Sequence, residues 1–85
     1  MTRIEQIRHA LAILEPTLLE VIDDSARHAG HAGAATGLGH FNVVIETNAF
    51  IGLSPIARHR LVYQALGSLM HTDIHALGIQ ARVPS

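Results

Sequence analysis

The chain contains no cysteine and no tryptophan, and all six of its basic residues are arginines. Without cysteine, it can form neither a disulfide bond nor a metal site built from its own thiolates. Its six basic and seven acidic residues give a formal net charge of −1. Proteins that bind nucleic acids usually carry an excess of basic residues, and this composition lacks one.

Long apolar runs are absent as well. No stretch approaches the roughly 20 residues that cross a bilayer, and the first ten residues lack the apolar core of a signal peptide. Hydrophobic residues make up 48% of the 85 residues and charged residues 15%, proportions typical of a folded globule. We therefore expect one domain over residues 1–85, cytoplasmic and without membrane contact.

Two helices are predicted from capping residues and from apolar spacing. The first begins at a capping box of Thr2 and Glu5 and ends before Pro16. The second begins at Ser54, which is followed by a proline suited to the first helical position. Its apolar side chains recur at steps of three and four residues through Leu69, so they share one face.

Three strands complete the predicted fold. Residues 18–24 and 40–47 can pair antiparallel across a glycine-rich loop at 25–39. After a break at 71–73, residues 76–81 alternate with a period of two. Because a helix precedes this last strand, we expect it to lie parallel to the second. The order helix-strand-strand-helix-strand predicts an α+β sandwich of two layers, with a mixed three-stranded sheet and both helices on one face.

Histidine is unusually frequent, with seven residues in the chain. His28 and His31 lie in the glycine-rich loop among residues too small to form a core, and His75 lies where the break becomes a strand. Neutral imidazoles are good metal ligands, but two of them do not complete a tetrahedral site. These positions therefore suggest a metal site completed by a partner. The alternative is that they are solvated loop histidines and a structural strand histidine.

The second helix carries a basic run, Arg58-His59-Arg60, in its early turns, where the helix dipole favours acidic residues. It is either a binding surface or an ordinary solvated face. A hydrolytic triad of Ser54, His59 and Asp73 is disfavoured, because Ser54 serves better as a helix cap and no nucleophile elbow surrounds it. We therefore do not expect an enzyme.

The segments FIGLSPIARHRLVYQAL at 50–66 and HALGIQAR at 75–82 closely resemble the BolA family, and DDSARHAGHAG at 23–33 extends the match. The resemblance covers Ile4 to Arg82. It implies a fold like the type II KH domain, which agrees with the predicted order of elements. It also implies a non-enzymatic protein that binds a monothiol glutaredoxin and, with glutathione, shares a bridging two-iron two-sulfur cluster, in cluster trafficking or iron regulation.

The resemblance further implies the cluster ligands. His75 matches the histidine ligand of the family's HAL segment, and the second ligand is a loop residue. Counting from Ser25 selects His28 and counting back from His40 selects His31, of which we favour His31. Alone, the protein is expected to be a monomer or a weak homodimer.

Bacterial members of the family are also described as transcriptional regulators, which gives an alternative function. In that case the second helix and the preceding turn would bind DNA. Arg58 and Arg60 would contact phosphates, with His59 between them. Since arginine here does not outnumber the acidic residues, we expect such binding to be weak.

Overall fold

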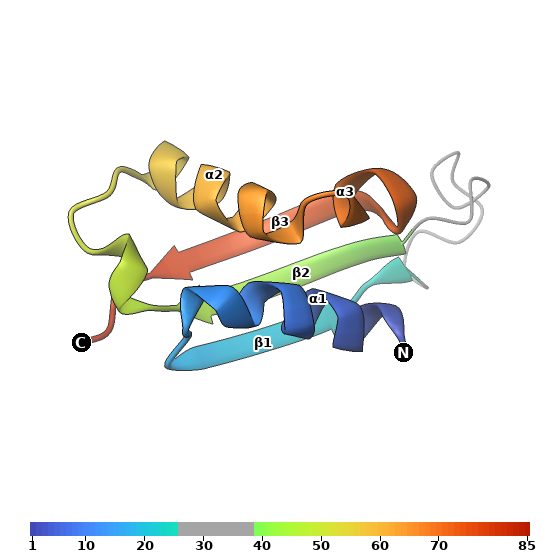
Figure 1. Ribbon diagram of the computed structural model, residues 1–85, viewed down its shortest axis with the longest axis horizontal. Coiled ribbons are helices and arrows are strands. Elements are labelled where there is room, and N and C mark those ends of the chain that lie inside the picture. The colour runs from blue at the N-terminus through green and yellow to red at the C-terminus, as the bar shows by residue number, and fades with distance from the viewer. Residues whose placement is uncertain (26–38) are drawn as a thin grey trace.

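The computed structural model describes residues 1–25 and 39–85, which form a helical layer on one face of a sheet (Figure 1). The helices are α1 (Arg3–Leu11), α2 (Pro55–Leu66) and α3 (Leu69–Thr72), and the strands are β1 (Leu18–Asp23), β2 (Gly39–Glu46) and β3 (Ile74–Arg82). The sheet order is β1-β2-β3, with β1 antiparallel and β3 parallel to β2. The predicted α+β class and mixed sheet are confirmed; the likeness to the type II KH domain stays a prediction.

Helix α1 begins at the predicted capping box. The Thr2 hydroxyl accepts from the Glu5 N–H at 3.1 Å, and the Glu5 carboxylate accepts from the Thr2 N–H at 3.0 Å. These hydrogen bonds lower the pKa of Glu5. A 3-10 turn (Ala12–Leu14) extends the helix before Pro16. Glu15 leaves the right-handed helical region as expected, but it enters the left-handed region at φ 51°, not the extended region usual before proline.

Helix α2 begins as predicted, because the Ser54 hydroxyl accepts from the Ala57 N–H at 3.2 Å. The prediction that the helix continues through Leu69 is wrong: α2 stops at Leu66, and Gly67 follows with φ 54°. Glycine adopts this backbone conformation without the steric cost that other residues incur. The break predicted at 71–73 is also largely wrong, since His71 and Thr72 belong to α3.

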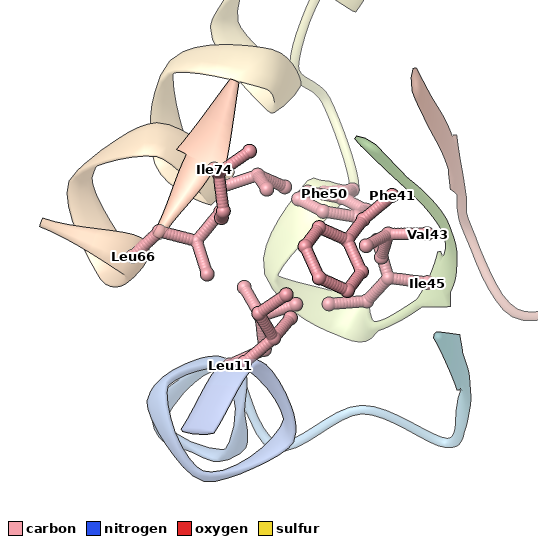
Figure 2. Close-up of a cluster of buried hydrophobic side chains, with 9 residues drawn as sticks. Leu11, Phe41, Val43, Ile45, Phe50, Leu66 and Ile74 are labelled. Carbon is pink, nitrogen blue, oxygen red and sulfur yellow. The ribbon is translucent and has the colours of Figure 1, made fainter. Parts of the chain in front are cut away.

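The hydrophobic core lies between the helices and the sheet (Figure 2). β2 is its centre, and its buried and half-buried residues alternate along the whole strand. α1 and α2 bury their apolar faces against the same side of the sheet, as predicted. The buried side chains are Ile7, Leu11, Phe41, Val43, Ile45, Phe50, Val62, Leu66 and Ile74.

Thr47 is buried among these apolar residues, directly after β2. Its hydroxyl donates to the Leu14 carbonyl at 2.6 Å and accepts from the Ala49 N–H at 3.1 Å. It thereby joins the end of the first helical segment to a 3-10 turn (Asn48–Phe50) that leads towards α2. Within residues 1–25 and 39–85, no helix is long and apolar enough to cross a membrane.

Candidate functional site

His75 is the extra residue of a β-bulge at the start of β3. Gly39 pairs with Ile74 and His40 pairs with Ala76, so no residue of β2 faces His75. Ile74 is buried in the core, whereas His75 is exposed. Bulges of this kind redirect a side chain without interrupting the rest of the ladder, and they are frequent beside functional sites. His75 is thus presented to the solvent at one end of the sheet.

His40 lies beside His75 and is a site residue that the sequence analysis missed. The two ring centroids are 5.0 Å apart, and the ring planes are inclined by 47°. His40 is half-buried and projects from the face of β2 opposite the buried Phe41. Its alternation with Phe41 could have placed it on that face. Its proximity to His75, however, depends on the parallel register of β2 and β3.

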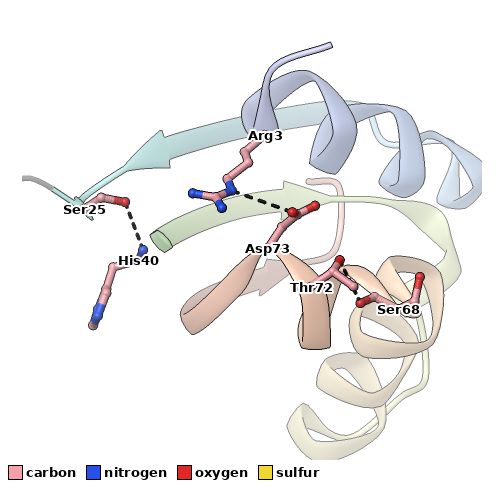
Figure 3. Close-up of polar contacts among 6 residues, drawn as sticks. All are labelled: Arg3, Ser25, His40, Ser68, Thr72 and Asp73. Atoms are coloured by element: carbon pink, nitrogen blue, oxygen red, sulfur yellow. Dashed lines mark hydrogen bonds and ion pairs between the residues drawn. The ribbon is translucent and has the colours of Figure 1, made fainter. Parts of the chain in front are cut away.

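Backbone hydrogen bonds fix the start of β2, from which His40 projects. The His40 N–H donates to the Ser25 hydroxyl at 3.1 Å (Figure 3), and the His40 carbonyl accepts from the Asp24 N–H at 2.8 Å. The Gly39 N–H donates to the Asp73 carbonyl at 3.0 Å. The segment after β1 therefore holds His40 in place, and the segment before β3 holds Gly39.

Gly39 is also required by packing, because the ring of Phe41 folds back over it. A Cβ atom at position 39 would lie 2.5 Å from a ring carbon of Phe41, closer than real contacts allow. The start of β3 has a support of its own. The Asp73 carboxylate forms an ion pair with Arg3 at 3.7 Å, which links α1 to the residue before β3 (Figure 3).

Asp23 stabilises the turn that leaves β1. Its carboxylate accepts from the Ser25 N–H at 2.8 Å. The hydrogen bond from the Ser25 side chain, followed by this backbone bond, lowers the pKa of Asp23. Ser25 in turn receives the His40 N–H. A short chain of polar contacts thus runs from Asp23 through Ser25 to the histidine site.

The described part of the site offers two imidazoles. His28 and His31 lie outside the described residues. Within residues 1–25 and 39–85, no three side chains of histidine, cysteine, aspartate or glutamate gather closely enough to hold a metal ion. Imidazole is a suitable ligand for iron, so His75 fits an iron site that takes its remaining ligands from elsewhere.

The basic run lies in the first half of α2, but its members are placed differently. The Arg58 guanidinium donates from Nε to the Leu53 carbonyl at 3.0 Å and from Nη1 to the Ala81 carbonyl at 3.2 Å. Arg58 thus fastens α2 to the preceding turn and to the end of β3. His59 is half-buried and Arg60 is exposed.

The disfavoured triad is not assembled. Ser54 caps α2 at its N-terminus. Asp73 follows α3, at the opposite end of the helical layer (Figure 1), where it pairs with Arg3. A helix of the length of α2 separates Ser54 from the segment that contains Asp73.

Comparisons with known proteins point to one family. The family model described as BolA-like protein matches residues 7–85. BolA-like protein 1 from Homo sapiens is 44% identical over 72 residues, which cover 85% of this chain and 50% of that protein. The Escherichia coli (strain K12) protein named DNA-binding transcriptional regulator BolA is 38% identical over 76 residues, 88% of this chain and 70% of that protein.

A solved structure supports the same assignment. The BolA domain of SufE1 from Arabidopsis thaliana superposes with a TM-score of 0.85 at 41% identity, covering 99% of this chain and 94% of that domain. The chain spans about half the length of several curated relatives that it matches. The corresponding full-length Arabidopsis relative is named a chloroplastic/mitochondrial protein, so a cytoplasmic location stays a prediction here.

Proposed function

The chain belongs to the BolA family, and from this premise we propose that it is a non-enzymatic accessory protein that binds a monothiol glutaredoxin. The two proteins, with glutathione, share a two-iron two-sulfur cluster, in cluster trafficking or iron regulation. The observation that carries the proposal is the bulge at His75, which exposes an imidazole beside the His40 ring at the end of the sheet.

His75 and one loop histidine, His31 or else His28, are the proposed ligands from this chain. The cluster is cargo that the complex holds and passes on, and its thiolate ligands come from the glutaredoxin and glutathione. The chain contains no cysteine, and the described part of the site contains two imidazoles, those of His40 and His75, without a third ligand group beside them. This supports a cluster shared with a partner. His40 lies close enough to His75 to orient its ring.

The test is His75→Ala in the complex with a cluster-loaded monothiol glutaredoxin. We expect the visible absorption and circular dichroism of the heterodimer to revert to those of the glutaredoxin alone, because an iron ligand is lost. The far-ultraviolet spectrum of the variant should stay unchanged, since an exposed bulge residue contributes nothing to the core. His9→Ala, at an exposed position in the last turn of α1, is the matched control.

Loop variants then identify the second ligand. His31→Ala and His28→Ala should differ, and the variant that loses the heterodimer spectrum marks the ligand. His40→Ala tests the residue that the structure adds to the site. An unchanged heterodimer spectrum in His75→Ala would contradict the proposed function and leave His75 as a structural histidine.

A transcriptional regulator is the second candidate function. The name of the Escherichia coli relative supports it, and so does α2, whose twelve residues contain two arginines and no acidic residue. The contacts of Arg58 weigh against it, because two carbonyl oxygens already accept from its guanidinium group. We therefore place this function second.

A further inference from the structure

The face of the sheet turned away from the helices, here called the outer face, carries a surface that the proposed cluster site does not use. Asn42 of β2 lies on this face, and so do its partners on the two neighbouring strands, Ile22 and Gly78. Along each strand, every second residue belongs to the outer face. Its apolar members are unusually accessible for their type: Ile22 is 47% exposed and Leu18 is 36% exposed.

A hollow of about 500 Å³ lies in the middle of the outer face. Gly78 is one of its lining residues, and the Asn42 amide oxygen lies so close over Gly78 that a side chain at position 78 would overlap it. The Asn42 amide nitrogen donates to the Asp24 carboxylate, which holds the amide in place. The side chains around the hollow are Ile22, Asp24, Asn42, Val44 and Gln80.

The hollow leads to the histidine site. A second hollow of about 250 Å³ shares Asp24, Asn42 and Gly78 with the first and is bounded by His40 and Ala76. His40 lies on the outer face, since its partner across the sheet is Ala76, and the His75 ring lies against it. The half-buried His40 ring therefore lies on the outer face, with the exposed His75 beside it.

The outer face is acidic, whereas α2 on the opposite side is basic. Glu20, Asp24 and Glu46 lie on or beside it, and its positive charge comes from Arg82, whose guanidinium donates to the Gln80 side chain at 2.9 Å. Complementary charge directs which surfaces of two proteins meet. A partner with basic residues around an apolar one fits the outer face.

We propose that the outer face is the docking surface for the thiolate-donating partner, which seats an apolar side chain in the hollow against Ile22 and Val44 and a basic side chain against Glu20. This inference rests on the proposed function, because it concerns the same partner. A protein that supplies thiolates to iron bound by His75 must approach the end of the sheet where the imidazoles lie. The two hollows extend from that end into the middle of the outer face.

Two exposed isoleucines on opposite sides of the molecule provide the test. Ile22 lies on the outer face at 47% exposure, and Ile56 lies on α2 at 66% exposure. Binding of a cluster-free monothiol glutaredoxin would be measured by isothermal titration calorimetry and by NMR shift mapping, so that no cluster is needed. We expect Ile22→Arg to weaken binding about tenfold or more and Ile56→Arg to change it less than about twofold.

Glu20→Lys is the second variant, in case Ile22→Arg impairs folding. Glu20 is exposed, so its replacement leaves no cavity, and it should weaken binding in the same direction. If both outer-face variants bind like the wild type while His75→Ala still removes the cluster spectrum, the docking surface is refuted and the proposed function stands. Weakening by Ile56→Arg alone would place the partner on α2. Absence of binding by the wild type would refute both proposals.

Discussion

Arg58 and Arg60 lie two residues apart in one helix, yet their guanidinium groups have different surroundings. Arg58 donates to carbonyl oxygens of the turn before α2 and of β3. Arg60 is exposed. Hydrogen bonds from a charged donor contribute more than neutral ones, and a carbonyl that loses its partner retains a desolvation cost. Arg58 is therefore better explained as a structural residue than as a phosphate contact.

We predict that Arg58→Ala lowers the free energy of unfolding by about 1.5–3 kcal/mol, whereas Arg60→Ala changes it by less than about 0.5 kcal/mol. Urea unfolding of both variants, followed by circular dichroism, measures the difference. Equal stability of the two variants would show that the contacts of Arg58 contribute little in solution.

Asp23 makes the stability depend on pH in the acidic range. Hydrogen bonds from Ser25 lower its folded-state pKa below the unfolded value near 3.9, so the ionised form stabilises the fold. This contribution is present above about pH 4 and is lost as the pH falls through the lowered pKa. Asp23→Asn should therefore be less stable than the wild type at neutral pH, by no more than about 1 kcal/mol for an exposed group.

Urea unfolding at a series of pH values would show the effect. The difference between Asp23→Asn and the wild type should shrink as the pH falls below about 4 and vanish where Asp23 is protonated in both states. A difference that stays constant down to about pH 2 would assign the effect to side-chain geometry and not to charge.

At the scale of elements, the helix caps could be predicted from the sequence, because each cap depends on hydrogen bonds between residues close together in the chain. Thr2, Glu5 and Ser54 bond to residues three positions away, and each acts as predicted. The end of α2 could not be predicted from the apolar spacing, because Leu69 continues that spacing beyond Gly67, where the helix ends. A positive φ at one glycine therefore overrode a pattern that extended past it.

The buried face of α2 is tested by Leu66→Ala. Leu66 is 3% exposed and packs in the core, so its truncation should lower the free energy of unfolding by about 2–5 kcal/mol. Ile56→Ala, in the same helix at 66% exposure, is the control and should cost less than about 0.5 kcal/mol. A loss under about 0.5 kcal/mol for Leu66→Ala would contradict this packing.

At the scale of the whole molecule, the layer order and strand directions followed from the sequence, because each connection restricts how its strands pair. The glycine-rich loop allowed the antiparallel pair, and the intervening helix required the parallel one. The site was only partly predictable. His75 was predicted as a ligand from the sequence, but its contact with His40 depends on the pairing of Gly39 with Ile74, which lie 35 residues apart in the chain, and on the bulge that follows.

The same two layers separate charge: acidic side chains on the outer face and arginines on α2. Any binding to duplex DNA should therefore occur through α2 and remain weak. Each neutralised phosphate contributes a slope of about −0.9 to the logarithm of affinity against salt, so Arg60 with at most one further contact predicts a slope no steeper than about −2. Fluorescence anisotropy across a salt series measures it. Nanomolar, sequence-specific binding at physiological salt that survives Arg60→Ala would contradict this prediction.

The bulge also bears on how this site could arise or disappear in evolution. Without His75, Ile74 and Ala76 would be consecutive, and they already pair with the consecutive residues Gly39 and His40. The inward and outward alternation of β3 would then be unbroken from Ile74 to Arg82. His75 is thus the residue of β3 that the pairing with β2 does not use. A lineage could gain or lose the ligand by a single-codon insertion or deletion while every core residue kept its neighbours.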